Sequence, residues 1–242
     1  MLLLEKRTRR GGRRVRRVRE KRKGRKVTVR VGNLNVGSMT GERRELADLM
    51  ERRKCLGSKQ SVGHTNEHEA GNRRGADKCN QCIRPHVGCE RQVKEDFWTE
   101  VDELLESIPM EERVMIGADF NGHVRQGNRG DEDVMGRHGV KDINEEGQMI
   151  VDFAKRMDFA VVNTFFEKKM EHRVTYKSGG RSTQVDYILY RRCNVKEIKD
   201  CKVIPGESVV KQHRIVVCSM TLIAKVRKQM QAQPRIKWWR LK

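Results

Sequence analysis

The stretch RVMIGADFNGH, residues 113–123, decides the prediction of the fold. Its Val-Met-Ile run is short, apolar and rich in β-formers, which predicts a buried strand that ends at the edge of a sheet. Asp119, Asn121 and His123 follow, each separated from the next by one residue. Because alternate residues of an extended chain point the same way, we expect these polar side chains to share one face. The alternative interpretation is an Asx-turn, in which Asp and Asn serve only the backbone.

The charge of the chain is strongly positive and unevenly distributed. Among 242 residues, 36% are apolar and 36% are charged, and the net charge is +20 with a sequence pI near 10.0. Residues 1–26 hold fourteen Lys and Arg against Glu5 and Glu20, and so carry +12 of this charge. Such a balance favours a polyanionic partner, nucleic acid first and an anionic membrane surface second.

Residues 1–26 are predicted to be a disordered basic arm, because like charges in a block repel one another and rarely pack. Such an arm contacts phosphates or serves as a nuclear-import signal, which predicts a nuclear location; the alternative is a solvated tail without a specific partner. Residues 225–242 are predicted to be a basic C-terminal tail. No apolar run approaches the ~20 residues of a membrane-spanning helix, and no export signal is seen. Seven cysteines then indicate reduced thiols in an intracellular, not a secreted, protein.

Strand and helix patterns alternate over residues 27–224, which predicts one α/β domain. Apolar and polar residues alternate at 26–31, where we expect the first strand, and a helical pattern follows at 41–54. Two further helices are expected where apolar residues recur at helical spacing, at 93–108 and 145–158. The other expected strands are 159–166, a hairpin formed by 173–176 and 182–190, then 195–203 and 214–224.

Residues 55–90 interrupt this pattern. Neither the helical nor the strand period is present over most of this segment, so it is predicted to be irregular. An irregular loop of this length inside a compact domain is unusual, and it indicates that part of the domain has been lost. The segment also carries Cys79, Cys82, His86 and Cys89. These residues form a soft-ligand set for zinc, although their spacing is tight; the alternative is that they are incidental.

Polar residues follow or interrupt the β-type runs at four distant places: Asn35, the pair Asp119 and Asn121, Asp186, and the pair Gln212 and His213. Layered α/β proteins build their sites from loops at one rim of the sheets, so we expect these residues to meet. A His oriented by an Asp, here His213 and Asp186, can offset charge on a phosphate. Asp119 beside Asn121 can position and deprotonate a water molecule. Together with the basic charge, these pairs favour a nucleic-acid phosphodiesterase.

Four motifs carry a resemblance to a known family: LNVGSMTG, IGADFNGHV, GGRSTQVDYIL and KQHRIVV. In order and context they resemble the endonuclease/exonuclease/phosphatase superfamily. Within it the chain looks most like the endonuclease domain of LINE-type (RTE/BovB-like) retrotransposons and the craniofacial development protein 2-like sequences similar to it. The resemblance covers about residues 27–54 and 81–242. It implies a two-sheet α/β sandwich and a Mg²⁺-dependent cut in DNA that leaves a 3′-hydroxyl.

The resemblance also implies a role for each matched residue. Asn35 stands where the family has an Asn near the metal. Asp119 stands where the family has the Asp that activates water, and Asn121 matches the Asn that contacts phosphate. Asp186 matches the Asp that orients the final His, and His213 matches that His.

Two departures from the family pattern concern the metal. Gln212 stands where many members have an acidic metal contact, and it would be a weak replacement. The family's Gln-Glu-Thr motif, whose Glu is the main metal ligand, does not occur in this sequence. Because Mg²⁺ is held mainly by carboxylates and substrate phosphates, the resemblance predicts weak metal binding here.

These departures predict a degenerate endonuclease, catalytically inactive, whose two-sheet sandwich has lost part of its first sheet. Three alternatives stay open. In the first, the chain is a metal-dependent DNA endonuclease that retains residual activity. In the second, the basic arm and the surviving scaffold bind DNA or RNA without cutting it. In the third, the chain is a decayed retroelement fragment with no selected role.

Overall fold

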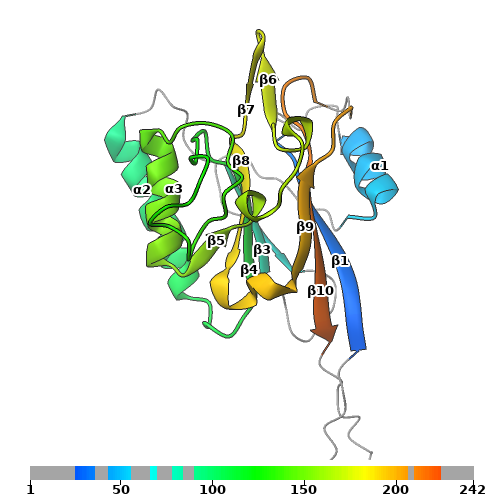
Figure 1. The fold of residues 1–242 in the computed structure, drawn as a ribbon. Coiled ribbons are helices and arrows are strands. Elements are labelled where there is room, and N and C mark those ends of the chain that lie inside the picture. The colour runs from blue at the N-terminus through cyan, green and yellow to red at the C-terminus, as the bar shows by residue number, and fades with distance from the viewer. Residues whose placement is uncertain are drawn as a thin grey trace, which may run out of the picture. The chain divides into compact units, whose positions relative to one another are not determined.

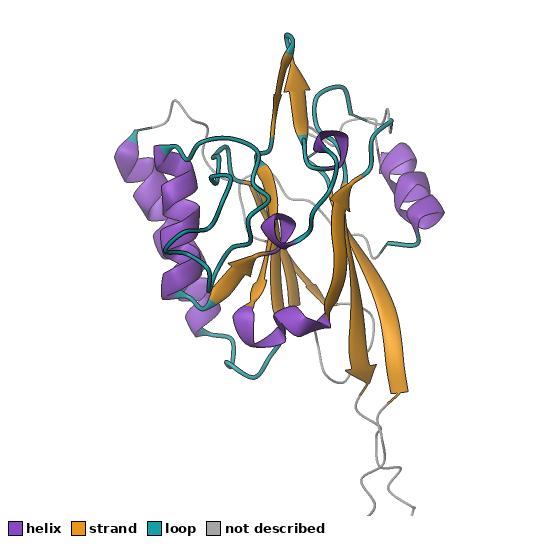
Figure 2. Ribbon diagram, in the orientation of Figure 1, coloured by secondary structure: helices purple, strands orange, loops and turns teal. Residues whose placement is uncertain are grey.

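The computed structural model describes residues 25–35, 43–55, 66–69, 78–83, 90–206 and 210–224. Residues Val27–Leu222 belong to one compact unit. In the described residues this unit is a mixed α/β structure with two larger sheets and a separate two-stranded hairpin (Figure 1). Helices are drawn in purple and strands in orange in Figure 2, where α2 and α3 lie on the opposite side of the sheets from α1.

The larger sheet is organised around β4 (Val114–Asp119), whose six residues are all buried. Its strand order is β2-β3-β4-β8-β5. β4 pairs antiparallel with β8 (Asp186–Arg191) and parallel with β3 (Lys78–Ile83). The edges are β2 (Asn66–Glu69) and β5 (Phe159–Val161). The apolar run at 114–116 is therefore a buried central strand, as predicted, and it continues without a break to Asp119.

The smaller sheet has the order β1-β10-β9. Its strands are β1 (Arg25–Asn33), β10 (Val216–Ala224) and β9 (Ile198–Val203), and β10 runs antiparallel to β9. One apolar cluster joins the two sheets. Its members from β4 and β8 are Met115, Ile188 and Tyr190, and those from β9 and β10 are Ile198, Cys201, Val203, Val216, Cys218 and Met220. The larger and the smaller sheet therefore pack against each other across this cluster.

Helices cover the outer faces of both sheets. α2 (Arg91–Glu106) and α3 (Glu145–Arg156) pack on the larger sheet through an aromatic cluster formed by Trp98, Phe120, Phe153 and Phe159. On the other side, Leu49 of α1 (Arg43–Arg53) is fully buried in a cluster with Leu34, Ile215 and Val217. Burying such side chains contributes roughly 1.5–3 kcal/mol each. All three predicted helices are present within one or two residues of their expected ends, apart from residues 41 and 42, which lie outside the described residues.

A hairpin forms around Gly179-Gly180 as predicted, but not from the predicted strands 173–176 and 182–190. It pairs residues 176–178 with 181–183, whereas residues 186–191 leave it and join the larger sheet as β8. β6 (Tyr176–Ser178) and β7 (Arg181–Thr183) form the hairpin, which stands clear of both sheets in Figure 1. Its turn is Gly179-Gly180, and both glycines have positive φ, as the tight hairpin turn requires. Three short 3₁₀ helices complete the described elements: Val162–Phe165, Met170–His172 and Arg192–Glu197.

The structure differs from the predicted pattern in two further segments. Residues 55–90 were expected to be irregular, but they include β2 and β3, which extend the larger sheet by pairing with each other and with β4. Their polar sequences gave no strand signal, because strand formation there depends on the free edge of β4. The expected strand 159–166 ends at Val161, and a 3₁₀ helix follows. There the hydroxyl of Thr164 donates to the carbonyl of Val161, a local bond that competes with strand pairing.

Three expectations concern residues outside the description. The basic arm and the C-terminal tail lie almost entirely outside the described residues, as do the side chains of the Cys79, Cys82, His86 and Cys89 set. The loss of part of the first sheet stays a prediction, because residues 56–65, 70–77 and 84–89 also lie outside the description. Among the helices that the structure describes, none is long and apolar enough to cross a membrane.

Candidate active site

Two buried carboxylates face each other where β4 ends and β8 begins. Asp119 and Asp186 are register partners across this antiparallel pair. Their exposed fractions are 6% and 0%. Two carboxylates brought together in a buried position repel each other, so such a pair is retained only where other groups compensate for the charge.

His213 and Asn35 supply that compensation from distant parts of the chain. His213 Nδ1 lies 3.0 Å from Asp186 Oδ2, and its Nε2 lies 3.6 Å from Asp119 Oδ2. Asn35, two residues beyond β1, donates from Nδ2 to Asp119 Oδ2 at 2.9 Å, and the same nitrogen lies 3.5 Å from His213 Nε2. Four residues predicted from strand ends therefore meet at one point.

Asn121 lies directly beside this group, although its backbone does not continue the strand. Its φ of +49° is left-handed, a conformation that Asn adopts more readily than most residues. Its backbone N–H donates to Asp119 Oδ1 at 3.0 Å, which is the bond of an Asx-turn. The expectation that Asp119, Asn121 and His123 alternate on one face is therefore wrong, because the extended chain ends at Asp119. The Asx-turn is therefore present at Asp119, and the functional interpretation of this residue stays a prediction.

The electrostatics of the group depend on burial and on the His213 hydrogen bond. Burial raises the pKa of Asp186 to about 6, against the opposing effect of the hydrogen bond with His213. Burial acts to lower the pKa of His213, but the hydrogen bond to Asp186 and the charges of both carboxylates outweigh it and raise that pKa. His213 is therefore held in its charged form to higher pH than an exposed histidine.

Two neighbours in the hairpin were not singled out from the sequence. The Thr175 hydroxyl accepts the backbone N–H groups of Val185 and Asp186, at 2.9 and 3.1 Å. The ring of Tyr176 lies 4.9 Å from the ring of His213, and the two residues form a β-bridge. A Thr-Tyr pair at the start of a predicted hairpin is an ordinary strand pattern, so the sequence gave no reason to connect it with His213.

Gln212 is not brought to the carboxylates. Its side chain is exposed, and its Nε2 donates to the Ser178 hydroxyl at 3.1 Å. Its backbone carbonyl accepts the N–H of Lys177 at 2.9 Å. These contacts connect Gln212 to the hairpin, and the next residue in the chain, His213, is the one that reaches the site.

Asp119, Asp186 and His213 form a group that fits a divalent cation. One ligand atom from each residue lies within 4.8 Å of the others. The Oδ1 atom of Asp186 is buried and accepts no hydrogen bond from the described residues, so it is free to be a ligand. Two carboxylates and an imidazole are a donor set that divalent cations such as Mn²⁺, Zn²⁺ or Mg²⁺ accept, with the imidazole favouring the first two.

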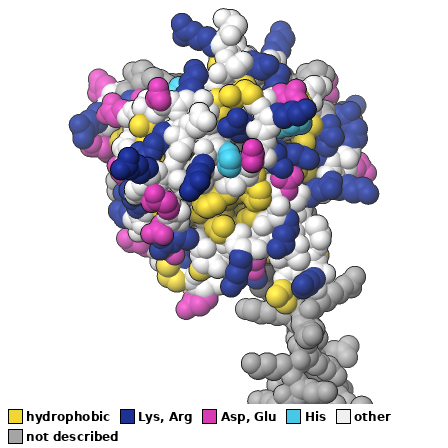
Figure 3. Space-filling view, in the orientation of Figure 1, with side chains coloured by type: hydrophobic (Ala, Val, Ile, Leu, Met, Phe, Trp, Pro, Cys, Tyr) yellow, Lys and Arg dark blue, Asp and Glu magenta, His cyan; other side chains and the backbone are white. Residues whose placement is uncertain are grey.

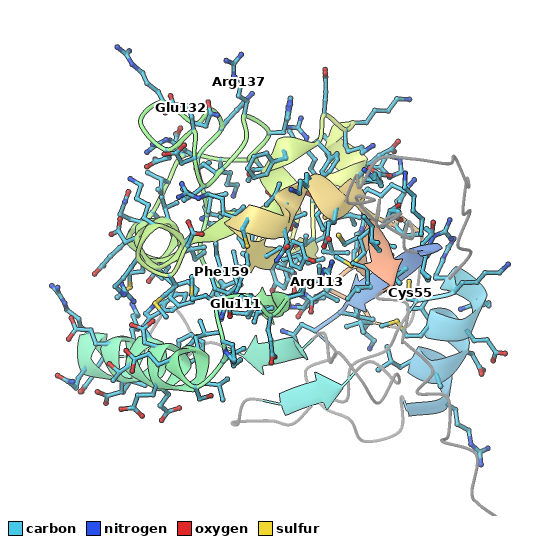
Figure 4. All side chains as sticks on the ribbon, turned by 90° about the horizontal axis from the view of Figure 1, so that it is seen from below. Cys55, Glu111, Arg113, Glu132, Arg137 and Phe159 are labelled. Atoms are coloured by element: carbon cyan, nitrogen blue, oxygen red, sulfur yellow. The ribbon has the colours of Figure 1, made fainter. Side chains whose placement is uncertain are left out.

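Basic side chains are prominent around the hairpin and over α1 in Figure 3. The exposed basic residues there include Lys177 and Arg181 of the hairpin and Lys211 beside His213. The loop that follows Asn121 adds Arg137, which points away from the sheets together with Glu132 in Figure 4. The segment that carries His213 thus lies beside positive charge, which favours approach of a polyanion.

Two solved nuclease structures share this arrangement of elements. The endonuclease domain of TRAS1, a telomere-specific non-LTR retrotransposon, matches with a TM-score of 0.56 at 10% identity, over 79% of this chain and 98% of that one. An AP endonuclease from Archaeoglobus fulgidus matches with a TM-score of 0.54 at 11% identity, over 78% of this chain and 98% of that one. The chain therefore has the same fold as these two endonucleases.

In sequence, the chain has a distant similarity to craniofacial development protein 2. The proteins from Tragulus javanicus and Bos taurus are each 26% identical over 132 residues, which is 54% of this chain. The matched segment spans 23% and 22% of their own lengths, so the chain corresponds to less than a quarter of these relatives. No family model matches the chain.

Proposed function

We propose that this chain is a degenerate DNA endonuclease of the retrotransposon type, which keeps the residues that handle protons and phosphate and lacks the main metal carboxylate. The observation that supports this function is the meeting of Asn35, Asp119, Asp186 and His213 from four distant segments. Similarity of fold to nucleases supports nucleic acid as the substrate. The order of the LINE-type motifs in the sequence supports DNA and the retrotransposon branch.

Asp119 is placed to take a proton from the attacking water. Its two oxygens accept hydrogen bonds from the Asn35 side chain and the Asn121 backbone, which fix the plane of the carboxylate. A general base must be held within hydrogen-bond reach of the proton that it removes, and a fixed carboxylate meets this condition at no further entropic cost. The Asn121 side chain would then contact the phosphate, as its place in the family motif implies.

His213 is placed to neutralise charge on the phosphate. Its Nδ1 bonds to Asp186, which fixes the ring and leaves Nε2 on the side of Asp119 and Asn35. A charged imidazole so oriented offers its Nε2–H to a phosphate oxygen on which negative charge develops. A divalent cation held by Asp119, Asp186 and His213 would supply Lewis-acid stabilisation of the same charge. The two uses of Nε2 exclude each other, so metal binding and phosphate donation by His213 compete.

The absence of a Gln-Glu-Thr motif from the sequence predicts low activity with Mg²⁺. A hard cation needs carboxylate oxygens that are free of competing partners, and Asp119 is already bonded to Asn35 and Asn121. Removal of a single group that stabilises the transition state typically costs about 10²–10³ in rate. We therefore expect Mg²⁺-dependent cutting to be reduced by at least this factor.

A plasmid-nicking assay tests the proposal. The full chain is incubated with supercoiled plasmid and Mg²⁺, in parallel with the TRAS1 endonuclease domain and with the variant Asp119→Ala. We expect conversion to the open circle to be about 10²–10³-fold slower than with the intact endonuclease. If the full chain nicks the plasmid robustly and Asp119→Ala abolishes this nicking, the proposed loss of activity is wrong and the chain is an active endonuclease.

The alternative function is nucleic-acid binding without cutting. The observation that favours it is the positive charge, +12 of which lies in residues 1–26, with Lys177, Arg181 and Lys211 exposed near His213. Binding of a labelled DNA duplex is measured over a range of salt concentrations, with and without residues 1–26. If the arm neutralises phosphates, its removal lowers the slope of log K against log[salt] by about 0.9 for each phosphate that the arm had neutralised. An unchanged slope removes the basis for this function.

A further inference from the structure

The outer edge of β8 loses its strand partner at the place where β8 carries Asp186. β5 pairs with β8 only over three residues, and the last pair is Val161 with Leu189. Beyond it the chain turns into the 3₁₀ helix Val162–Phe165. The peptide groups of Asp186 and Ile188 on this edge are buried, and a buried backbone group needs a partner from elsewhere.

Asn163, in the first turn of this 3₁₀ helix, is that partner. Its Nδ2 donates to the carbonyl of Asp186 at 3.0 Å, and its Oδ1 accepts the N–H of Ile188 at 2.9 Å. One side-chain amide thus replaces the peptide group that a longer β5 would have offered. The side chain is 5% exposed, so water does not compete for either bond.

The remaining outward-facing group of Asp186 is also held by a side chain. Its N–H donates to the Thr175 hydroxyl at 3.1 Å. Asp186 is therefore fixed on this edge by Asn163 and Thr175, and on the other edge by the register with Asp119 in β4. The position of its carboxylate, and hence the 3.0 Å bond to His213 Nδ1, depends on these contacts.

We propose that Asn163 is a positioning residue for the Asp186–His213 pair. It touches neither His213 nor the candidate metal ligand atoms, and it acts through the backbone of β8. This proposal rests on the proposed function in one respect: it assumes that His213, oriented by Asp186, contacts the phosphate. Loss of the Asn163 bonds lets Asp186 shift outward, and the hydrogen bond with His213 is then lost.

The variant Asn163→Leu removes both bonds and keeps the volume of the side chain. Thr164→Val is the matched control: Thr164 lies in the same 3₁₀ helix, is fully buried, and bonds to the Val161 carbonyl and the Gly136 N–H, not to β8. The full chain is labelled with ¹⁵N-histidine, and the Nδ1–H signal of His213 is identified by its loss in His213→Gln. Such a proton is observed when a hydrogen bond protects it from exchange with water.

We expect the His213 Nδ1–H signal in the unsubstituted protein and in Thr164→Val, and its loss in Asn163→Leu. The amide of Ile188 should also exchange with deuterium at least tenfold faster in Asn163→Leu, because its acceptor is gone. If Asn163→Leu does not fold, Asn163→Asp takes its place: its carboxylate still accepts from Ile188 but, when ionised, cannot donate to the Asp186 carbonyl. We expect the same loss of signal.

A folded Asn163 variant that keeps the signal would overturn the positioning role. Loss of the signal in Thr164→Val as well would also overturn it, because the effect would then reflect a general loosening of the 3₁₀ helix. None of these measurements requires DNA cleavage. Robust nicking by the unsubstituted protein would refute the proposed loss of activity and would leave the outcome for Asn163 unaffected.

Discussion

The two ends of β4 each carry a cluster of charged side chains, and they differ in how completely those charges are satisfied. Next to its first residue, Arg113 donates to both carboxylate oxygens of Glu197 at 2.6 and 2.7 Å, and the Tyr190 hydroxyl donates to the same carboxylate at 2.9 Å. Figure 4 shows Arg113 close to β4 in the view from below. At the other end, Asp119 and Asp186 face each other with one histidine between them.

The pKa values follow the same contrast. Burial acts to raise the pKa of Glu197, but the bonds from Arg113 and Tyr190 outweigh it, so that this pKa is lowered. At the other end burial dominates and the pKa of Asp186 is raised to about 6. A carboxylate whose oxygens are fully hydrogen-bonded contributes to stability. A buried carboxylate with fewer partners is unfavourable for stability, and such groups are typical of functional sites. The same strand is thus structural at one end and a candidate site at the other.

The largest expected effect is on hydrolysis and is confined to the Asp119 end. His213→Gln should reduce residual nicking of supercoiled plasmid by about 10²–10³-fold, because the charge that faces the phosphate is lost. Arg113→Met should leave the rate per folded molecule unchanged. Equal loss of activity in both variants would contradict the distinction between the two ends.

The largest expected effect on stability is at the opposite end. Arg113→Met leaves the carboxylate of Glu197, whose side chain is 13% exposed, without its bidentate partner. We expect the free energy of unfolding to fall by about 2–3 kcal/mol, since removal of one member of a partly buried pair leaves a charge that water compensates only in part. Urea unfolding followed by circular dichroism measures this change. A loss below the error of the measurement would show that the Arg113–Glu197 pair is not structural.

The pH dependence of stability should originate at the Asp119 end. Asp186 and His213 both have a higher pKa in the folded state than in the unfolded chain, so both bind protons more tightly when folded. Their contribution is fully present below the unfolded pKa values and is lost as pH rises through the folded ones, for Asp186 between 3.8 and about 6 and for His213 above 6.5. The part due to Asp186, from 3.8 to about 6, is worth about 2–3 kcal/mol.

The double variant Asp186→Asn/His213→Gln serves as the comparison for this pH dependence. Its stability, measured by urea unfolding at pH 4.5, 6 and 8, should change less with pH than that of the unsubstituted protein. A slope of the same size in both proteins would mean that the titrating groups lie elsewhere.

The smallest expected effect concerns the packing between the two sheets near Asp119. Gly117 lies against the buried Asn33, and a Cβ at this position would approach Asn33 Cγ to 3.0 Å. We therefore expect Gly117→Ala to cost about 1–2 kcal/mol of stability, because overpacking displaces one of the strands. Asn33 is two residues before Asn35, so the same shift should lengthen the Asn35–Asp119 contact. A crystal structure of the variant measures that distance, and an unchanged 2.9 Å bond would show that the sheets adjust elsewhere.

The sequence by itself determined the parts of the molecule that depend on local pattern. Helical periodicity located α2 and α3, and the apolar run before Gly117 located the buried strand β4. Polar residues at strand ends identified Asp119, Asp186 and His213, because strand ends at one rim of a sheet are where α/β proteins gather their functional side chains. The excess of Lys and Arg favours a polyanionic partner, which stays a prediction.

Tertiary structure alone decided the features that depend on contacts between distant residues. β2 and β3 have no strand pattern of their own, and they form because β4 offers them a free edge. Asn163 looked like part of a strand, and its function as a side-chain partner of β8 appears only once β5 has ended early. The reason is physical: periodicity reports which side of an element is buried, whereas the partner of a buried polar group depends on how segments more than twenty residues apart come together.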